Sequence, residues 1–202
     1  MTVETSILAN GLTVAKDAMP GVKSVAVGVW VSAGARHETA AQSGLSHMLE
    51  HMAFKGTARR SALDIASEVE AVGGHLNAYT AREQTCYYVR LLQEDLALGA
   101  DILADIVRQP RFAPDELERE RGVIIQEIGQ AEDTPDDIVF DLVQEASYQD
   151  QPMGRYILGT VGHVSGFTPD DCAGYRSTHY EPGSMIFAAA GGVDHQTVRR
   201  LA

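Results

Sequence analysis

The chain has 202 residues, and its 16 basic and 28 acidic side chains leave a formal net charge of -12. This acidic balance argues against nucleic acid or an anionic membrane as the main partner, because either would need a basic surface. With 45% hydrophobic and 22% charged residues, the composition is that of a folded globular domain with a sizeable core, which excludes disordered and collagen-like classes.

The first half of the chain is predicted to alternate strands and helices. Two short strands, 3–8 and 12–15, on either side of the turn dipeptide Asn10-Gly11 indicate a hairpin. Residues 23–31 then place valine at every second position, which is typical of a sheet strand. The other elements predicted in this half are helices at 43–54 and 61–72 and strands at 76–80 and 85–91.

The second half is predicted to be mostly helical. Its expected elements are helices at 94–107, 114–132 and 137–147, a loop-rich stretch at 148–168, a helix at 169–178, a strand at 185–190 and a helix from residue 193. Because strands and helices are interspersed and a hairpin is present, the sequence predicts an α+β fold. We expect a layered mixed or antiparallel sheet packed with helices, forming a single domain over residues 1–202.

Cysteine content and hydropathy indicate the compartment. Cys86 and Cys172 are the only cysteines, and neither belongs to a CxxC pair. Two cysteines are too few for a disulfide framework in a chain of this size, which favours a reducing compartment. Residues 1–15 lack a leader pattern, and no apolar window is long enough to span a bilayer. We therefore expect a protein of the bacterial cytoplasm without a membrane span.

The predicted helix at 43–54 carries polar residues that suit a metal. His47 and His51 are one helical turn apart, so their imidazoles can converge on one ion. Glu50 lies beside them and could act as a base towards water, while the apolar residues of the helix point to the opposite side. The alternative is a solvated helix face that happens to carry two histidines and an acid.

The predicted helix at 114–132 offers carboxylates next to its apolar side. The apolar side consists of Leu117, Val123, Ile124 and Ile128. Glu120 and Glu127 are two turns apart at one edge of that side, where a carboxylate is costly unless it is paired or bound to a cation. Salt bridges to arginines such as Arg119 or Arg121 are the alternative explanation, and the spacing does not decide between them.

The pattern formed by these residues resembles the sequence motifs of a known protein family. Residues 47–51 match the HxxEH zinc signature, and Glu127 follows 76 positions after His51. Together with residues 73–80 and 118–127, they resemble the pitrilysin/insulinase-like metallopeptidases (family M16) over almost the whole chain. Within that family, the segment 44–57 is similar to the β-subunit of the mitochondrial processing peptidase and its bacterial relatives.

The resemblance implies a catalytic zinc site. His47, His51 and Glu127 would bind Zn²⁺, and Glu50 would be the general base that activates water. Glu120 would take part by orienting a histidine ligand through a hydrogen bond.

The resemblance also implies where a peptide binds. Asn77, Ala78 and Tyr79 would lie on an edge strand to which an extended peptide adds as a further strand. Phe54 would contact the substrate side chain just after the scissile bond. The negative net charge of the chain suits a basic peptide, since an acidic surface attracts cations.

Members of the family have two homologous halves that close like a clamshell around a chamber, and this chain resembles the first half. The implied fold is therefore the metallohydrolase fold shared by processing peptidases and autoinducer-synthesis lyases, with the C-terminal homologous half absent. The implied function is that of a zinc-dependent metalloendopeptidase of the processing-peptidase type, which would need a C-terminal half or a homologous subunit, as a homodimer or a heterodimer.

Two other functions fit the same sequence features. A non-catalytic structural or partner subunit of the same fold is the first alternative, although every position of the motif is present. A lyase of the autoinducer-synthesis type also uses an HxxEH helix, but its third ligand is a cysteine, and Cys86 and Cys172 lack the flanking residues of that family.

Overall fold

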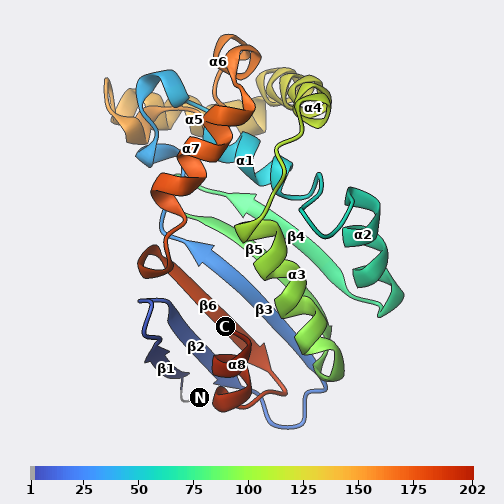
Figure 1. The fold of residues 1–202 in the computed structure, drawn as a ribbon. Helices are drawn as coiled ribbons and strands as arrows, with labels where there is room; N and C mark the ends of the chain where they lie inside the picture. The colour runs from blue at the N-terminus through green and yellow to red at the C-terminus, as the bar shows by residue number, and fades with distance from the viewer. Residues whose placement is uncertain (1–2) are drawn as a thin grey trace.

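A computed structural model describes residues 3–202 of the chain. Its centre is one mixed sheet of six strands in the order β1-β2-β6-β3-β5-β4 (Figure 1). The strands are β1 (Val3–Ile7), β2 (Thr13–Ala18), β3 (Ser24–Val31), β4 (His75–Thr80), β5 (Thr85–Leu92) and β6 (Met185–Gly191). Neighbouring strands are antiparallel except for β2 and β6, which are parallel.

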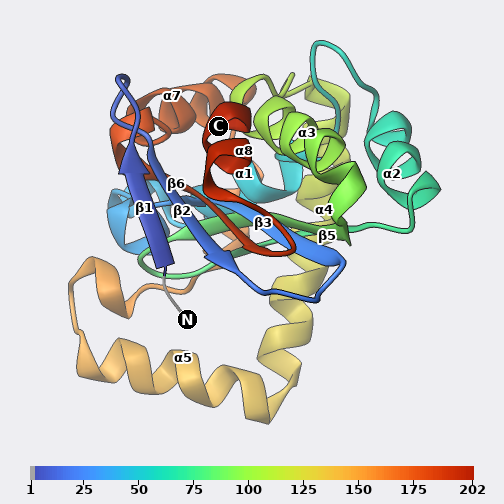
Figure 2. The same cartoon turned by 90° about the horizontal axis from the view of Figure 1, so that it is seen from below.

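Eight α-helices in the described residues pack around this sheet. The helices are α1 (Leu45–Ala53), α2 (Ala62–Ala71), α3 (Leu96–Arg108), α4 (Pro114–Asp133), α5 (Pro135–Ser147), α6 (Val161–Gly166), α7 (Pro169–His179) and α8 (His195–Leu201). Figure 2 shows α2, α3, α7 and α8 on one side of the sheet and α5 on the other. The predicted α+β fold with a mixed sheet and packed helices is therefore confirmed.

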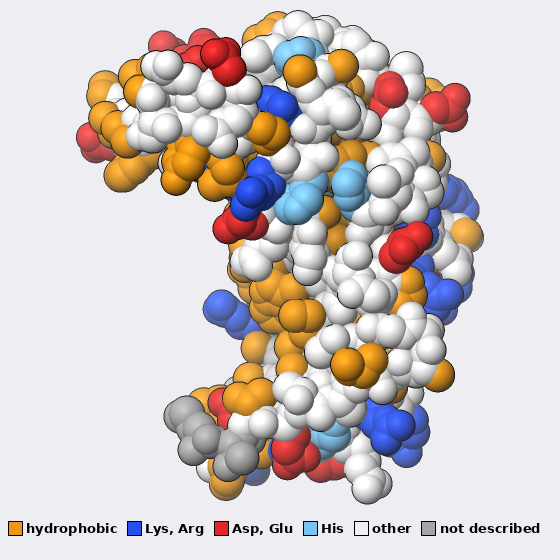
Figure 3. Space-filling view, turned by 90° about the vertical axis from the view of Figure 1, so that its left-hand side faces the viewer, with side chains coloured by type: hydrophobic (Ala, Val, Ile, Leu, Met, Phe, Trp, Pro, Cys, Tyr) orange, Lys and Arg blue, Asp and Glu red, His pale blue; other side chains and the backbone are white. Residues whose placement is uncertain are grey.

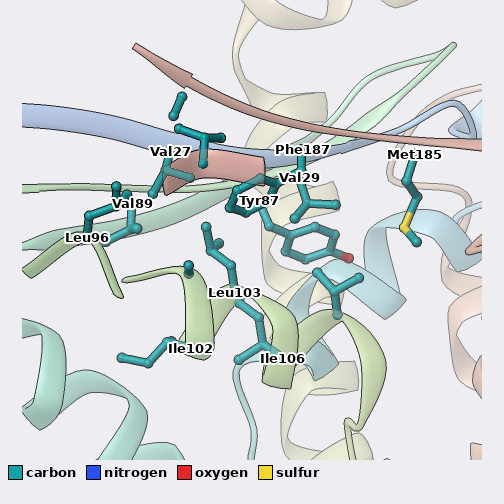
Figure 4. Close-up of a cluster of buried hydrophobic side chains, with 14 of the residues drawn as sticks. Val27, Val29, Tyr87, Val89, Leu96, Ile102, Leu103, Ile106, Met185 and Phe187 are labelled. Atoms are coloured by element: carbon teal, nitrogen blue, oxygen red, sulfur yellow. The ribbon is translucent and has the colours of Figure 1, made fainter. Parts of the chain in front are cut away.

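The main core lies between the sheet and α3 (Figure 4). Alternate residues of β3 and β5 point into it, because successive side chains of a strand point to opposite faces. Val27 and Val89 from the sheet and Leu103 and Ile106 from α3 are each no more than 1% exposed. A second core forms where α1 packs against α4 and α7. This second core fixes the position of α1 relative to α4.

The predicted elements are present, with shifted ends. The strand predicted at 12–15 continues to Ala18, and the helix predicted at 137–147 begins at Pro135. Proline is well tolerated there, because the first residue of a helix has no partner for its N–H in any case. The stretch predicted as a loop at 148–168 contains the short helix α6. Val123, which we grouped with the apolar side of α4, is 40% exposed.

The segment after α1 is tied to α3 by a network of charged groups. Asp105 on α3 accepts hydrogen bonds from Thr57 Oγ1 at 2.7 Å and from Arg60 Nη1 at 3.0 Å. The Asp105 side chain is fully buried, and the side chain of Arg60 is 11% exposed. Arg59 contacts the second oxygen of Asp105, at 3.2 Å, from a half-exposed position. Asp101, one turn earlier on α3, binds both arginines nearer the surface.

Within residues 3–202, none of the helices combines the length and the apolar character needed to cross a bilayer.

Candidate metal centre

The start of α1 is fixed by a buried carboxylate. Glu38, in the preceding loop, accepts the N–H of Gly44 at 2.9 Å and that of Ser46 at 2.7 Å. It thereby satisfies helix N–H groups that have no partner within the helix. Burial raises the pKa of Glu38, against the opposing effect of the bonds from Ser46 and Gly44. Gly44 itself has φ +94, and a Cβ there would lie 2.6 Å from the carbonyl oxygen of Leu158.

The two predicted faces of α1 are separate in the structure. Leu45, Met48, Leu49 and Met52 are fully buried against α4 and α7. His47, Glu50, His51 and Phe54 are half-buried on the other side. The polar residues of this side contact other elements, because His51 pairs with Glu120 of α4 and Glu50 pairs with Thr80 of β4.

His47, His51 and Glu127 form the one group of possible metal ligands found in the part of the chain that the structure describes. Their ligand atoms lie within 4.8 Å of one another. Glu127 Oε2 is 3.8 Å from His47 Nε2 and 3.6 Å from His51 Nε2. These distances exceed the usual hydrogen-bond length. They are close to the ~3.4 Å that separates two ligands of a tetrahedral zinc with bonds of about 2.1 Å.

The protonation of His47 also suits a metal ligand. Burial, together with the charge of the neighbouring His51, lowers the pKa of His47 to about 3. The imidazole is therefore neutral at pH 7, with a lone pair free to bind a cation. Its Nδ1 is buried without a hydrogen-bond partner in the described residues. The polar surroundings of the ring consequently lie on the Nε2 side, towards His51 and Glu127.

Glu120 on α4 contacts His51 at the ring nitrogen that faces away from Glu127. The Nδ1 atom of His51 is 2.9 Å from Glu120 Oε2, so the Nε2 atom is left free to face Glu127. The other oxygen of Glu120 is 2.7 Å from Lys55 Nζ. The predicted alternative, a salt bridge from Glu120 or Glu127 to Arg119 or Arg121, is not formed. Those arginines instead bind Asp115, Glu116, Glu118 and two backbone carbonyl groups.

Glu50 lies at the end of the edge strand. Its Oε2 accepts a hydrogen bond of 2.5 Å from the hydroxyl of Thr80, the last residue of β4. Burial raises the pKa of Glu50, and this effect outweighs the opposing bond from Thr80. A carboxylate with a raised pKa beside candidate metal ligands is suited to accepting a proton at neutral pH.

The predicted peptide-binding residues lie on and beside β4. Within residues 3–202, β4 pairs with β5 alone, so its other edge is free. Asn77 and Tyr79 are exposed, and the N–H of Ala78 is bonded at 2.8 Å to the side-chain oxygen of Asn77. The ring centroids of Phe54 and Tyr87 are 6.3 Å apart, and Phe54 lines a cavity of about 350 Å³ between α2 and β4. Three of these four residues thus lie on the strand that ends at Thr80, the partner of Glu50, and Phe54 lies at the end of the helix that carries the two histidines.

Three residues of this region were missed in the sequence. Lys55 lies four positions after His51, a helical spacing that would have revealed it. Thr80 and Glu38 carry no such signal, because each reaches α1 from a separate segment. Cys86 and Cys172 are both buried free thiols. Neither belongs to the group of metal ligands found in residues 3–202.

Comparison with known proteins confirms the resemblance seen in the sequence. The family profile described as insulinase (peptidase family M16) matches residues 13–161. An uncharacterized zinc protease of Streptomyces coelicolor is 43% identical over 199 residues, which cover 98% of this chain and 43% of that protein. The mitochondrial-processing peptidase subunit beta of Saccharomyces cerevisiae is 44% identical over 198 residues, with the same two coverages of 98% and 43%.

Solved structures agree with this comparison. The crystal structure of a protease from Helicobacter pylori superposes with a TM-score of 0.94 at 26% identity. The match covers 99% of this chain and 49% of that one. The chain therefore spans less than half the length of these relatives.

Proposed function

Because the chain belongs to the insulinase family of peptidases (M16), we propose that it is the zinc-binding half of a metalloendopeptidase of the processing-peptidase type. The observation that supports this function is the grouping of His47, His51 and Glu127 within 4.8 Å, with Glu50 beside them. The zinc-protease names of its relatives point to the same chemistry.

The donor set fits Zn²⁺. Two imidazole nitrogens and one carboxylate are the ligands of many catalytic zinc sites, which leave the fourth position open. We assign His47, His51 and Glu127 as these ligands. When bound, zinc supplies Lewis acidity that polarises the scissile carbonyl and lowers the pKa of a water molecule. Glu120 keeps the Nδ1 proton of His51 in place, so that Nε2 faces the metal position.

Glu50 is proposed as the general base. Its carboxylate accepts the proton of the attacking water and later delivers it to the leaving amine. Thr80 holds this carboxylate in one orientation through its 2.5 Å hydrogen bond. Because Thr80 ends β4, the base is positioned by the same strand whose free edge is available for substrate.

The substrate is proposed to be an extended peptide that adds to β4. The free N–H and C=O groups of an edge strand pair readily with another extended chain. Asn77, Ala78 and Tyr79 lie on this strand, and Phe54, at the end of the helix that carries the two histidines, lines a cavity between α2 and β4. The net charge of -12 favours a basic peptide.

Both cysteines are buried free thiols, which suits the bacterial cytoplasm proposed as the location.

A homologous half or subunit is the proposed partner. α5 has no buried residue, and its side chains Val139, Phe140, Leu142 and Val143 are 46–73% exposed. Figure 3 shows hydrophobic side chains on this projecting part of the molecule, above a hollow. The sheet face on the same side is lined by Trp30 and several alanines around a cavity of about 210 Å³. An apolar surface of this extent needs a cover, and the chain spans less than half of its relatives.

Zinc binding tests this function directly. The purified chain, with its intact mass measured on the same sample, is expected to hold one zinc when analysed for metal. His47→Ala and Glu127→Ala should each lose it. His75→Ala, which alters an exposed histidine of β4 outside the group, should keep it. A wild-type chain that binds no zinc would overturn the proposal and favour a non-catalytic partner subunit.

A further inference from the structure

Glu120, which contacts the Nδ1 atom of His51, also contacts a lysine. Lys55 Nζ lies 2.7 Å from Glu120 Oε1, and Glu120 Oε2 lies 2.9 Å from His51 Nδ1. We infer that Lys55 is a positioning residue for His51, acting through Glu120. This inference rests on the proposed zinc site, and it extends that site to a residue which does not touch the metal position.

The geometry leaves Glu120 little freedom. Its side chain is 8% exposed, and each of its two oxygens is held by a different residue. Both of those residues belong to the end of α1, because the N–H of Lys55 is bonded to the carbonyl oxygen of Met52 in the last turn. Lys55 and His51, which belong to one segment, therefore each contact a different oxygen of the Glu120 carboxylate. Rotation of that carboxylate would break the contact with Lys55.

The balance of charges at the site also requires Lys55. Glu50, Glu120 and Glu127 surround the two histidines, and a divalent cation would offset only two of these three carboxylates. Among the described residues, Lys55 is the one lysine or arginine paired with any of the three. Without it, the buried carboxylate of Glu120 would have no cation to compensate its charge, which is costly. Glu120 would then lose the contact that fixes its second oxygen, and its carboxylate could turn away from His51.

The consequence concerns the proton of His51. A histidine binds a metal well through one nitrogen when the other donates a proton to a fixed acceptor. Lys55 keeps Glu120 in place as this acceptor. The Nε2 lone pair of His51 therefore stays directed at Glu127, 3.6 Å away.

The test is the zinc affinity of the chain, measured by competition with a fluorescent chelator. Lys55→Met should weaken zinc binding by about tenfold or more, the range found for residues that support metal ligands. Lys55→Arg, which keeps the charge, should restore most of the affinity. Lys23→Met serves as the matched control, because Lys23 is exposed and far along the chain from the site, and it should leave the affinity unchanged.

A double mutant separates positioning from a general loss of structure. In a Glu120→Gln background, Lys55→Met should cost little further affinity, because the two residues act as one unit. The His51 Nδ1–H signal in ¹⁵N-edited NMR spectra of the metal-free protein should exchange faster in Lys55→Met than in wild type. This signal keeps the test decisive even if Lys55→Met lowers stability.

The possible failures are distinguishable. Wild-type zinc affinity in Lys55→Met, or an equal loss with and without Glu120, would overturn the role of Lys55 and leave the proposed function intact. Failure of the wild-type chain to bind zinc would overturn both.

Discussion

Replacing Asp105 by alanine should destabilise the protein far more than any surface charge change. The side chain of Asp105 is fully buried, and its carboxylate accepts hydrogen bonds from Thr57 and Arg60. Its removal leaves the Thr57 hydroxyl without its acceptor and the buried guanidinium of Arg60 with only the more exposed carboxylates of Asp101 and Glu68. Breaking a buried charge pair in this way costs about 3–5 kcal/mol of unfolding free energy. For a domain of this size, that loss corresponds to a fall in Tm of about 6–20 °C.

Asp101→Ala is the matched control. Asp101 binds the same two arginines, but its side chain is 45% exposed, so its loss should cost about 1 kcal/mol or less. Chemical unfolding followed by circular dichroism, with thermal scans as a check, measures both variants. Equal destabilisation by the two substitutions, or a loss below about 1 kcal/mol for Asp105→Ala, would refute the reasoning that burial decides the magnitude.

Three further predictions follow from the structure. Glu50→Gln should retain zinc by elemental analysis and lower peptide hydrolysis in the complete assembly by about 100-fold or more; normal turnover would refute Glu50 as the base. Burial raises the pKa of Asp105, but the bonds from Thr57, Arg60 and Arg59 outweigh it and hold the pKa below its ordinary range. The folded state therefore binds fewer protons than the unfolded state, so this stabilisation is present above about pH 3.9 and is lost as the pH falls through the lower folded pKa. Unfolding of wild type and Asp105→Asn from pH 7 to 2.5 should show the difference between them shrinking in acid. Gly44→Ala should destabilise by at least about 2 kcal/mol, because its φ is +94 and the new Cβ would lie 2.6 Å from a carbonyl oxygen. Gly73→Ala, at φ +67 with open space around it, should cost only about 1 kcal/mol in thermal unfolding.

The local part of the site could be predicted from the sequence. His47 and His51 are brought together by the geometry of one helix, which spacing alone reveals. The apolar residues of α1 were likewise assigned to the buried side, since helical periodicity decides this. Glu127 is different, because it reaches the histidines only after α4 packs on α1 through the second core. Its spacing indicated an unusual carboxylate, and only the family resemblance suggested a partner for it.

The contacts that join separate segments could not be predicted. Glu38 caps α1 from a preceding loop, and Thr80 reaches Glu50 from the end of β4. No periodicity links such residues, since their distance depends on how the layers stack. α5 shows a second feature that the sequence pattern could not predict, the exposure of its side chains. Its residues were predicted as a helix, but the pattern did not show that its apolar side chains stay exposed, with Phe140 at 73%.

The place of β6 in the sheet has a consequence for folding. β6 lies between β2 and β3, although it comes more than 150 positions after either of them in the chain. Until it inserts, the hairpin of β1 and β2 has no strand joining it to β3, β5 and β4, and the edges of β2 and β3 are unpaired. Such late, long-range pairing slows folding and leaves edges open to wrong partners. During synthesis the sheet cannot close until β6 has been made, so the helices that hold the two histidines and Glu127 can form before the sheet is complete.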